Sequence, residues 1–196
     1  MRQKIILSLI PVTGLGIILI LLGTLRIWSA QAGPTTRYVA RQSACGGRNP
    51  CYADIQAAVD DSNFGDEILI AGGIYPGVQT VMVNGSVYSQ ALFIDKDITI
   101  RGGFTTTTWT QPDLVTSPTI LDAQDLGRVV YITSSITVKL EGLGLTNGRA
   151  FYNSPNNSLN GGGVYVAAAN VTISNCQVMS STGSNGAGIL TQGCLH

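Results

Sequence analysis

Charge and histidine are both scarce in this sequence. Asp, Glu, Lys and Arg make up 11% of the 196 residues, and the single histidine is His196. The chain has no basic stripe, which argues against a nucleic-acid partner, because such partners are held through phosphate contacts from Lys and Arg. Without an earlier histidine, no Cys-His zinc set is expected. We therefore expect no metal or cofactor and no nucleic acid.

Glycine and small polar residues are abundant instead. Gly, Thr, Ser and Asn recur from Gly33 onward, together with enough Ile, Val and Leu to argue against disorder. This balance is typical of many short strands joined by polar turns. The sequence therefore predicts an all-β fold.

The N-terminal segment 1–32 reads as an export signal. Arg2 and Lys4 precede the almost wholly apolar run 5–25, and Ala30-Gln31-Ala32 supplies the small-x-small pattern that a signal peptidase accepts. The run also approaches the ~20 residues that span a bilayer, so an uncleaved anchor that contacts the membrane stays open. Both alternatives place the remainder outside the membrane, as an extracellular or cell-surface domain 33–196.

Four cysteines follow the signal. In an oxidising compartment we expect Cys45 and Cys51 to form a disulfide across the loop 46–50, with a metal pair as the weaker alternative. Cys176 lies in an apolar strand pattern and is expected to be a buried thiol. Cys194 has no assignment.

One short helix is expected directly after this loop. Asp54 can act as its N-cap, because its carboxylate can accept from the free N–H groups of the first turn. Ile55, Ala58 and Val59 then form a narrow apolar face, and Gly65-Asp66 turns the chain away. Such a short helix is marginal alone, so it must pack against apolar neighbours.

The rest of the chain consists of short strands that repeat. They are expected at 37–40, 67–70, 74–77, 91–94, 98–103, 119–121, 129–132, 136–145, 163–166, 171–178 and 188–190. Residues 140–145 match 173–178 in alternation, and residues 161–166 match 186–190. A unit of roughly 20–30 residues with Gly and Asn at its corners predicts a solenoid, because both residues tolerate left-handed backbone angles.

These segments resemble a known family. Residues 54–59 and 65–75, with their short helix, Gly-Asp turn and Gly-x-Tyr turn, are similar to the opening of pectin-lyase-like right-handed parallel β-helix proteins, and 98–104 with 121–124 are similar to a second coil. The resemblance covers about residues 37–190. It implies an exported bacterial protein whose N-terminal capping helix covers the open end of a right-handed parallel β-helix.

The catalytic motifs of related enzymes are not found. The polygalacturonase-like Asp-Asp pair occurs at Asp60-Asp61, on a helix end, and Gly73–Gly77 departs from the methylesterase Gly-x-Tyr-x-Glu motif. Asp95, Asp97 and Arg101 suggest the acids and base of a lyase. Alternation would place all three on the outward face of one strand, where a solvated charged patch is the favoured interpretation. No residue is assigned a catalytic role.

Two further sets of residues are also interpreted as structural rather than functional. Asp122 and Asp125 lie near Arg128 in the sequence and are also interpreted as solvated. Four aromatic residues could line a sugar-binding groove or could simply pack in the fold, and packing is the favoured interpretation. They are Tyr131, Phe151, Tyr152 and Tyr165.

The sequence leaves three function classes open. The first is an exported, non-catalytic module that displays loops for adhesion or carbohydrate binding, with polysaccharide or cell-surface components as partners. The alternative is the N-terminal part of a polysaccharide lyase or hydrolase whose catalytic coils lie elsewhere. A remnant or a tethered stalk is the third. Because residues 191–196 do not read as a cap, we expect 33–196 to be the N-terminal part of a longer domain.

Overall fold

The computed structural model describes residues 33–133, 135–150 and 160–192. The expected signal or anchor at 1–32 therefore lies outside the described residues, as does Cys194. Within the described ranges, no helix is long and apolar enough to cross a bilayer.

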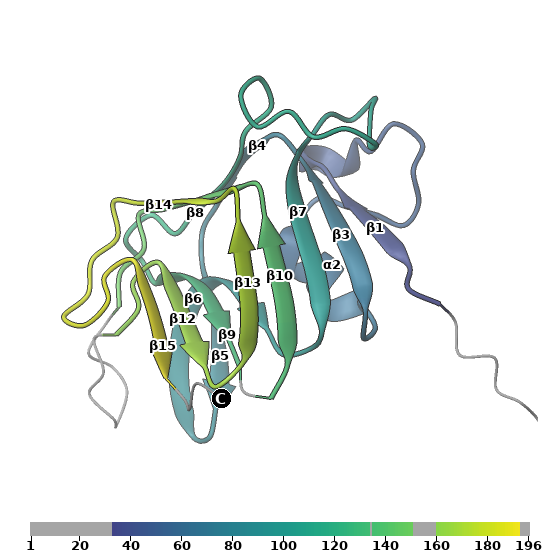
Figure 1. The fold of residues 1–196 in the computed structure, drawn as a ribbon. Helices are drawn as coiled ribbons and strands as arrows, with labels where there is room; N and C mark the ends of the chain where they lie inside the picture. The colour runs from purple at the N-terminus through teal and green to yellow at the C-terminus, as the bar shows by residue number, and fades with distance from the viewer. Residues whose placement is uncertain (1–32, 134, 151–159, 193–196) are drawn as a thin grey trace, which may run out of the picture. The chain divides into compact units, whose positions relative to one another are not determined.

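The strands form three sheets in which nearly all neighbours run parallel (Figure 1). Sheet A contains β1 (Thr36–Val39), β2 (Cys51–Tyr52), β3 (Asp66–Ala71), β7 (Ile98–Phe104), β10 (Thr137–Glu141) and β13 (Asn170–Ser174). Sheet B contains β4 (Gly73–Pro76), β8 (Thr119–Asp122), β11 (Leu143–Thr146) and β14 (Gln177–Met179). Sheet C contains β5 (Gln79–Val83), β6 (Ser86–Ile94), β9 (Arg128–Ile132), β12 (Val164–Ala167) and β15 (Ile189–Gln192).

The chain visits the sheets in a fixed order. From β3 onward it passes through A, B and C in turn four times, and each strand bonds to its equivalents in the passes before and after. The order is β13-β10-β7-β3-β1-β2 in sheet A, β14-β11-β8-β4 in sheet B and β15-β12-β9-β6-β5 in sheet C. The protein is therefore mostly β, with parallel sheets.

The strand register follows the sequence repeats. Leu140 lies opposite Ile173, and Leu145 lies opposite Val178. Val164 lies opposite Ile189. The alignment predicted from the repeats is confirmed for both pairs of segments. The loops between strands absorb the differences in length, because register depends on the strands alone.

One hydrophobic cluster contains residues from all three sheets. Ile100 and Leu140 from sheet A, Leu121 from sheet B, and Leu92 and Val130 from sheet C are all 0–1% exposed within it. Alternate residues of the inner strands β3, β7, β10, β11 and β12 point to this core, as expected for a pleated strand. Full burial of one such side chain contributes about 1.5–3 kcal/mol, so the core is the main source of stability.

Equivalent corners use residues that tolerate left-handed angles. Gly142, between β10 and β11, has φ of 68°, and Asn175, at the equivalent position between β13 and β14, has φ of 53°. The prediction of Gly and Asn at the corners is confirmed here. Gly102 is needed for space instead, because a Cβ there would lie 2.6 Å from the carbonyl oxygen of Gly142.

Helix α2 (Ile55–Asp61) forms where the sequence predicts it. The Asp54 carboxylate accepts a 3.0 Å hydrogen bond from the Ala57 N–H, which caps the helix. Ile55, Ala58 and Val59 are 4%, 0% and 1% exposed and join the main core. The helix therefore gains its stability from packing rather than from its own length.

Gln56 joins α2 to sheet C. Its amide oxygen accepts from the Phe93 N–H at 2.8 Å, and its amide nitrogen donates to the Phe93 carbonyl oxygen at 3.1 Å. The side chain thus satisfies the two outward backbone groups of Phe93, as a neighbouring strand would do. This covers the edge of β6 beyond its pairing with β5.

A β-hairpin lies in a region where the sequence analysis expected only residues 91–94 to be a strand. β5 and β6 pair antiparallel, with Val83 opposite Ser86 and the dipeptide Asn84-Gly85 as the turn. Both turn residues have positive φ, at 50° and 78°. Asn-Gly between two apolar segments is a strong hairpin signal, which could have revealed this element.

The three residues Asp95, Asp97 and Arg101 do not share a strand. β6 ends at Ile94 and β7 begins at Ile98, so both aspartates lie in the connection. Arg101 lies within β7, about 13 Å along the extended chain from Asp97. The prediction that one strand carries all three is wrong, because a strand boundary interrupts the alternation; Asp95 is exposed, and Asp97 and Arg101 are half-buried.

Candidate functional site

A recess of about 380 Å³ lies between the start of α2 and strand β4. Its polar lining comes from Arg41 and Gln42 of the short 3₁₀ helix η1 (Arg41–Ser43), from Asp54 at the helix N-cap and from Gln79 of β5. Its apolar lining includes Ile74, Tyr75, Val78, Ala91 and Leu121. This volume and mixed lining suit a small ligand, since such pockets combine an apolar wall with a few polar groups.

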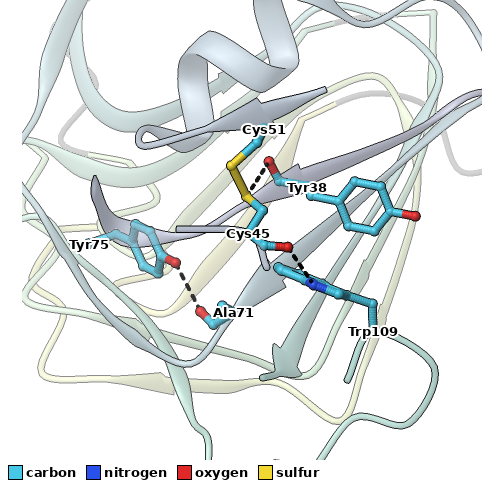
Figure 2. The surroundings of a disulfide bond; sticks show 6 residues. All are labelled: Tyr38, Cys45, Cys51, Ala71, Tyr75 and Trp109. Atoms are coloured by element: carbon cyan, nitrogen blue, oxygen red, sulfur yellow. Dashed lines mark hydrogen bonds between the residues drawn. A yellow bond between two sulfur atoms is a disulfide. The ribbon is translucent and has the colours of Figure 1, made fainter. Parts of the chain in front are cut away.

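The disulfide closes the loop that directly follows the polar residues Arg41 and Gln42. Cys45 and Cys51 are bonded at 2.07 Å, and the bridge closes the loop that follows η1 (Figure 2). Cys51 belongs to β2, which pairs with β1. Arg41 is thereby tied to sheet A within a few residues, which limits the positions open to its side chain.

Trp109 contacts the disulfide loop at Cys45. Its indole N–H donates to the Cys45 carbonyl oxygen at 3.2 Å, and its ring meets Tyr38 edge-on at 5.0 Å between centroids (Figure 2). Phe104 stacks on the same indole, with 6.0 Å between ring centroids. The Trp109 side chain is only 6% exposed, so this aromatic cluster is a small second core beneath the loop.

Tyr75 forms part of the floor of the recess. Its hydroxyl donates to the Ala71 carbonyl oxygen at 2.9 Å (Figure 2), and burial raises its pKa to about 12. The phenol therefore stays protonated at neutral pH, and its donor is already used. Ile74, at 49% exposure, offers an apolar surface beside it. A ligand would meet an aromatic and apolar floor here.

Several polar groups at the recess can hydrogen-bond to a ligand. The Asp54 carboxylate is engaged by the helix, and Gln56 is engaged by Phe93. The exposed Arg41 and Gln42 and the half-buried Gln79 are left at the rim. In the part of the chain that the structure describes, no three His, Cys, Asp or Glu side chains are placed to bind a metal ion.

An ionic cluster with a buried pair, Arg37 and Asp66, and an exposed third member, Asp61, lies at the end of α2. The Arg37 guanidinium, on a residue 5% exposed, contacts Asp66 through Nη1 and Asp61 through Nε at 3.0 Å. Asp66, 1% exposed, also accepts from the N–H groups of Thr35 at 2.6 Å and Asn63 at 2.7 Å. The cluster joins β1, β3 and the end of α2.

The two carboxyl groups of this cluster have lowered pKa values for different reasons. Burial alone would raise the pKa of Asp66, but the N–H groups of Thr35 and Asn63 and the Arg37 charge together lower it. For Asp61, hydrogen bonds from Tyr52 and then Arg37 lower the pKa. Asp61 is exposed, as the prediction of a solvated helix end has it, but the sequence pattern did not reveal its partners, because they lie 9 and 24 residues away in the chain.

The charged residues singled out in the sequence have separate partners. Asp97 accepts from the Thr137 N–H at 2.8 Å, whereas Asp95 lies 3.8 Å from Lys96. Arg101 bridges Glu67 at 3.3 Å and Glu141 at 3.2 Å on the outer side of sheet A. These are surface ion pairs, which contribute little to stability.

Asp122 and Arg128, which lie near each other in the sequence, also have separate partners. Asp122 accepts from the side chain of Asn147 at 2.8 Å, and Arg128 donates to the Asn160 carbonyl oxygen at 2.9 Å.

Cys176 is a free, half-buried thiol beside the main core, and burial raises its pKa. Phe151 and Tyr152 lie outside the described residues.

The remaining predicted aromatic residues are packed together. Tyr131 lies 5.6 Å from Phe93 and 5.1 Å from Tyr165, measured between ring centroids across β6, β9 and β12. Tyr88 adds a third contact to Tyr131 at 5.0 Å, and the Arg128 guanidinium lies over Tyr88 and Tyr165. Tyr131 and Tyr165 are 4% and 8% exposed, so they do not offer a face to a sugar ring.

Two further recesses lie over the outer side of sheet B. One of about 470 Å³ is lined by Gly72, Gly73, Ile120 and the threonines of the 105–116 loop, and one of about 140 Å³ by Ile120, Gly144 and Met179. Neither contains a charged side chain. The recess at α2 therefore has the strongest combination of shape and chemistry.

Comparison of the chain with family models, curated proteins and solved structures finds no match in any of the three.

Proposed function

We propose that this protein is an exported, non-catalytic module that binds carbohydrate, built on a right-handed parallel β-helix. The fixed A-B-C order of the strands, their repeated register and the helix against the first coils support the β-helix. A crystal structure that gave a left-handed path, or sheets that did not enclose one core, would contradict this part of the proposal.

The recess at α2 carries the functional part of the proposal. Arg41, Gln42 and Gln79 present donors and acceptors around an apolar floor, and sugars pair with such sites through adjacent hydroxyls and the apolar face of the ring. A fixed backbone lowers the entropic cost of binding, and the Cys45–Cys51 bridge closes the loop directly after η1, the short helix that bears Arg41. The partner would be a polysaccharide or another cell-surface glycan.

Binding to purified polysaccharides tests this function. Affinity electrophoresis and calorimetry measure how strongly the protein, purified in the form in which cells produce it, binds neutral and uronate-containing polysaccharides. Arg41→Ala and Gln79→Ala should each weaken binding by at least about tenfold, since each removes hydrogen bonds to the ligand. Arg48→Ala is the matched control, because Arg48 is an exposed arginine in the nearby disulfide loop but does not line the recess.

Two outcomes would refute the assignment: no polysaccharide binds, or binding survives both recess variants.

Export is tested separately by measuring the intact mass of the protein in membrane and extracellular fractions. Loss of residues 1–32 from the extracellular species supports a cleaved signal, and full mass in the membrane fraction supports an anchor. A full-length chain found only in the cytoplasm would refute export.

A further inference from the structure

Strand β5 is an unprotected sheet edge. It is the outermost strand of sheet C, and its sequence from Gln79 to Val83 contains no charge and no proline. Edge strands usually carry charges, prolines or covering elements, because their free backbone groups can pair with another chain. β5 has none of these devices within the described residues.

Neighbouring edges at this end of the stack are protected. The edge of β6 beyond β5 is covered by Gln56 at Phe93. β4 is the last strand of sheet B, and it ends in Pro76, which has no N–H to donate. The contrast singles out β5. By comparison, β13, β14 and β15 form the opposite end, and nothing in the structure shows what covers them.

The hairpin geometry decides which backbone groups of β5 face outward. In a two-residue hairpin the pair next to the turn, Val83 and Ser86, exchanges hydrogen bonds, and so does every second pair after it. Val81 and Gln79 therefore bond to β6. The N–H and C=O groups of Thr80 and Met82 point away from β6, and both residues are exposed.

This pattern is complementary to itself. When two copies of β5 lie antiparallel about a two-fold axis at Val81, Thr80 of each copy faces Met82 of the other. The two free N–H and two free C=O groups on each edge then pair as four hydrogen bonds. Because β5 carries no charge, the pairing brings no like charges together, and closed two-fold contacts are the commonest symmetry of soluble oligomers.

Exposed apolar side chains lie beside this edge. Met82 is 71% exposed, and its cross-strand neighbour Val87 is 48% exposed. In the paired arrangement these two residues and their copies gather on one face of a four-stranded β6-β5-β5-β6 ribbon. We infer that β5 is the contact through which two copies of this chain form a two-fold dimer.

The small size of the edge determines the strength of this contact. Five-residue strands bury less than the roughly 1,000 Å² expected of a stable interface, so the dimer should be weak and depend on concentration. The contact is independent of the carbohydrate-binding proposal, because none of Thr80, Val81 and Met82 lines the recess.

Charge-swapped variants test the pairing. One variant carries Thr80→Lys with Met82→Lys, and the other carries Thr80→Glu with Met82→Glu. Both positions are exposed, so the fold should tolerate either pair. Analytical ultracentrifugation of the chain should show at least a tenfold weaker dimer for each variant alone and recovery when the two are mixed. Val115→Lys, at an 88% exposed position, is the control and should leave the dimer unchanged.

A cross-link locates the two-fold axis. Val81→Cys places two thiols opposite each other across the axis, where paired Cα atoms lie about 4.5 Å apart, within the range for a disulfide. Non-reducing gels should show a covalent dimer for Val81→Cys and none for Val115→Cys. The inference is overturned if the chain is monomeric at all concentrations, if either charged variant dimerises like the original, if mixing restores nothing, or if Val81→Cys gives no dimer.

Discussion

Replacement of Asp66 by alanine should produce the largest loss of stability at any charged residue described here. The substitution removes a 1% exposed carboxylate that accepts from Thr35 and Asn63 and contacts Arg37. Arg37, 5% exposed, keeps Asp61 but loses its buried partner. Breaking a buried pair costs about 3–5 kcal/mol, because the remaining charge is left uncompensated.

Urea unfolding followed by the fluorescence of Trp109, which is 6% exposed, measures this loss. A loss of about 3–5 kcal/mol corresponds to a drop in Tm of about 6–20 °C for a unit of this size. Asp66→Asn should lose less stability than Asp66→Ala, since the amide keeps one acceptor oxygen. Asp95→Ala is the control: this aspartate lies in an exposed connection, so the change should stay within about 0.5 kcal/mol. A loss below about 1 kcal/mol for Asp66→Ala would show that the cluster does not stabilise the fold.

Three further predictions concern the core, the disulfide and acid. Leu140→Ala should cost about 2–5 kcal/mol in urea unfolding, because Leu140 is fully buried; a loss under about 1 kcal/mol would contradict that packing. Replacement of both Cys45 and Cys51 by serine should cost about 2 kcal/mol, as expected for a loop of this length, and an unchanged midpoint would refute it. Because the folded pKa of Asp66 is lowered, its contribution is present above the ordinary carboxyl pKa of about 3.9 and is lost as pH falls through the folded value. Urea midpoints measured from pH 6 to pH 2 should therefore fall less steeply in Asp66→Asn.

Local patterns in the sequence predict the strands and their register. The alternation at 140–145 and 173–178 fixes which residues face inward, so the pairing of these two segments follows from the sequence alone. Helix α2 is predictable for the same reason, since Asp54 and the Ile55, Ala58 and Val59 face lie within one short segment. Both features depend on patterns that are complete within a few consecutive residues.

The recess and the ionic cluster could not be predicted in this way. Arg37 meets Asp61 and Asp66 across 24 and 29 residues, and only the stacking of β1 on β3 brings them together. The recess likewise combines Arg41 with Gln79, from two different parts of the fold. The sequence pattern instead singled out Asp95, Asp97 and Arg101 because they are neighbours in the chain, although both aspartates lie in the connection before β7 and only Arg101 belongs to that strand.

The order of the strands also determines how the fold would respond to mechanical force. In sheet A, β13 is joined to β3 only through β10 and β7, and the other sheets follow the same rule. Tension applied between the first and last strands would therefore act along the hydrogen bonds that join successive strands, and these would break in series. The last strands, where Ile173 and Val178 are only partly buried, would detach first, and each remaining strand would keep its partner in register.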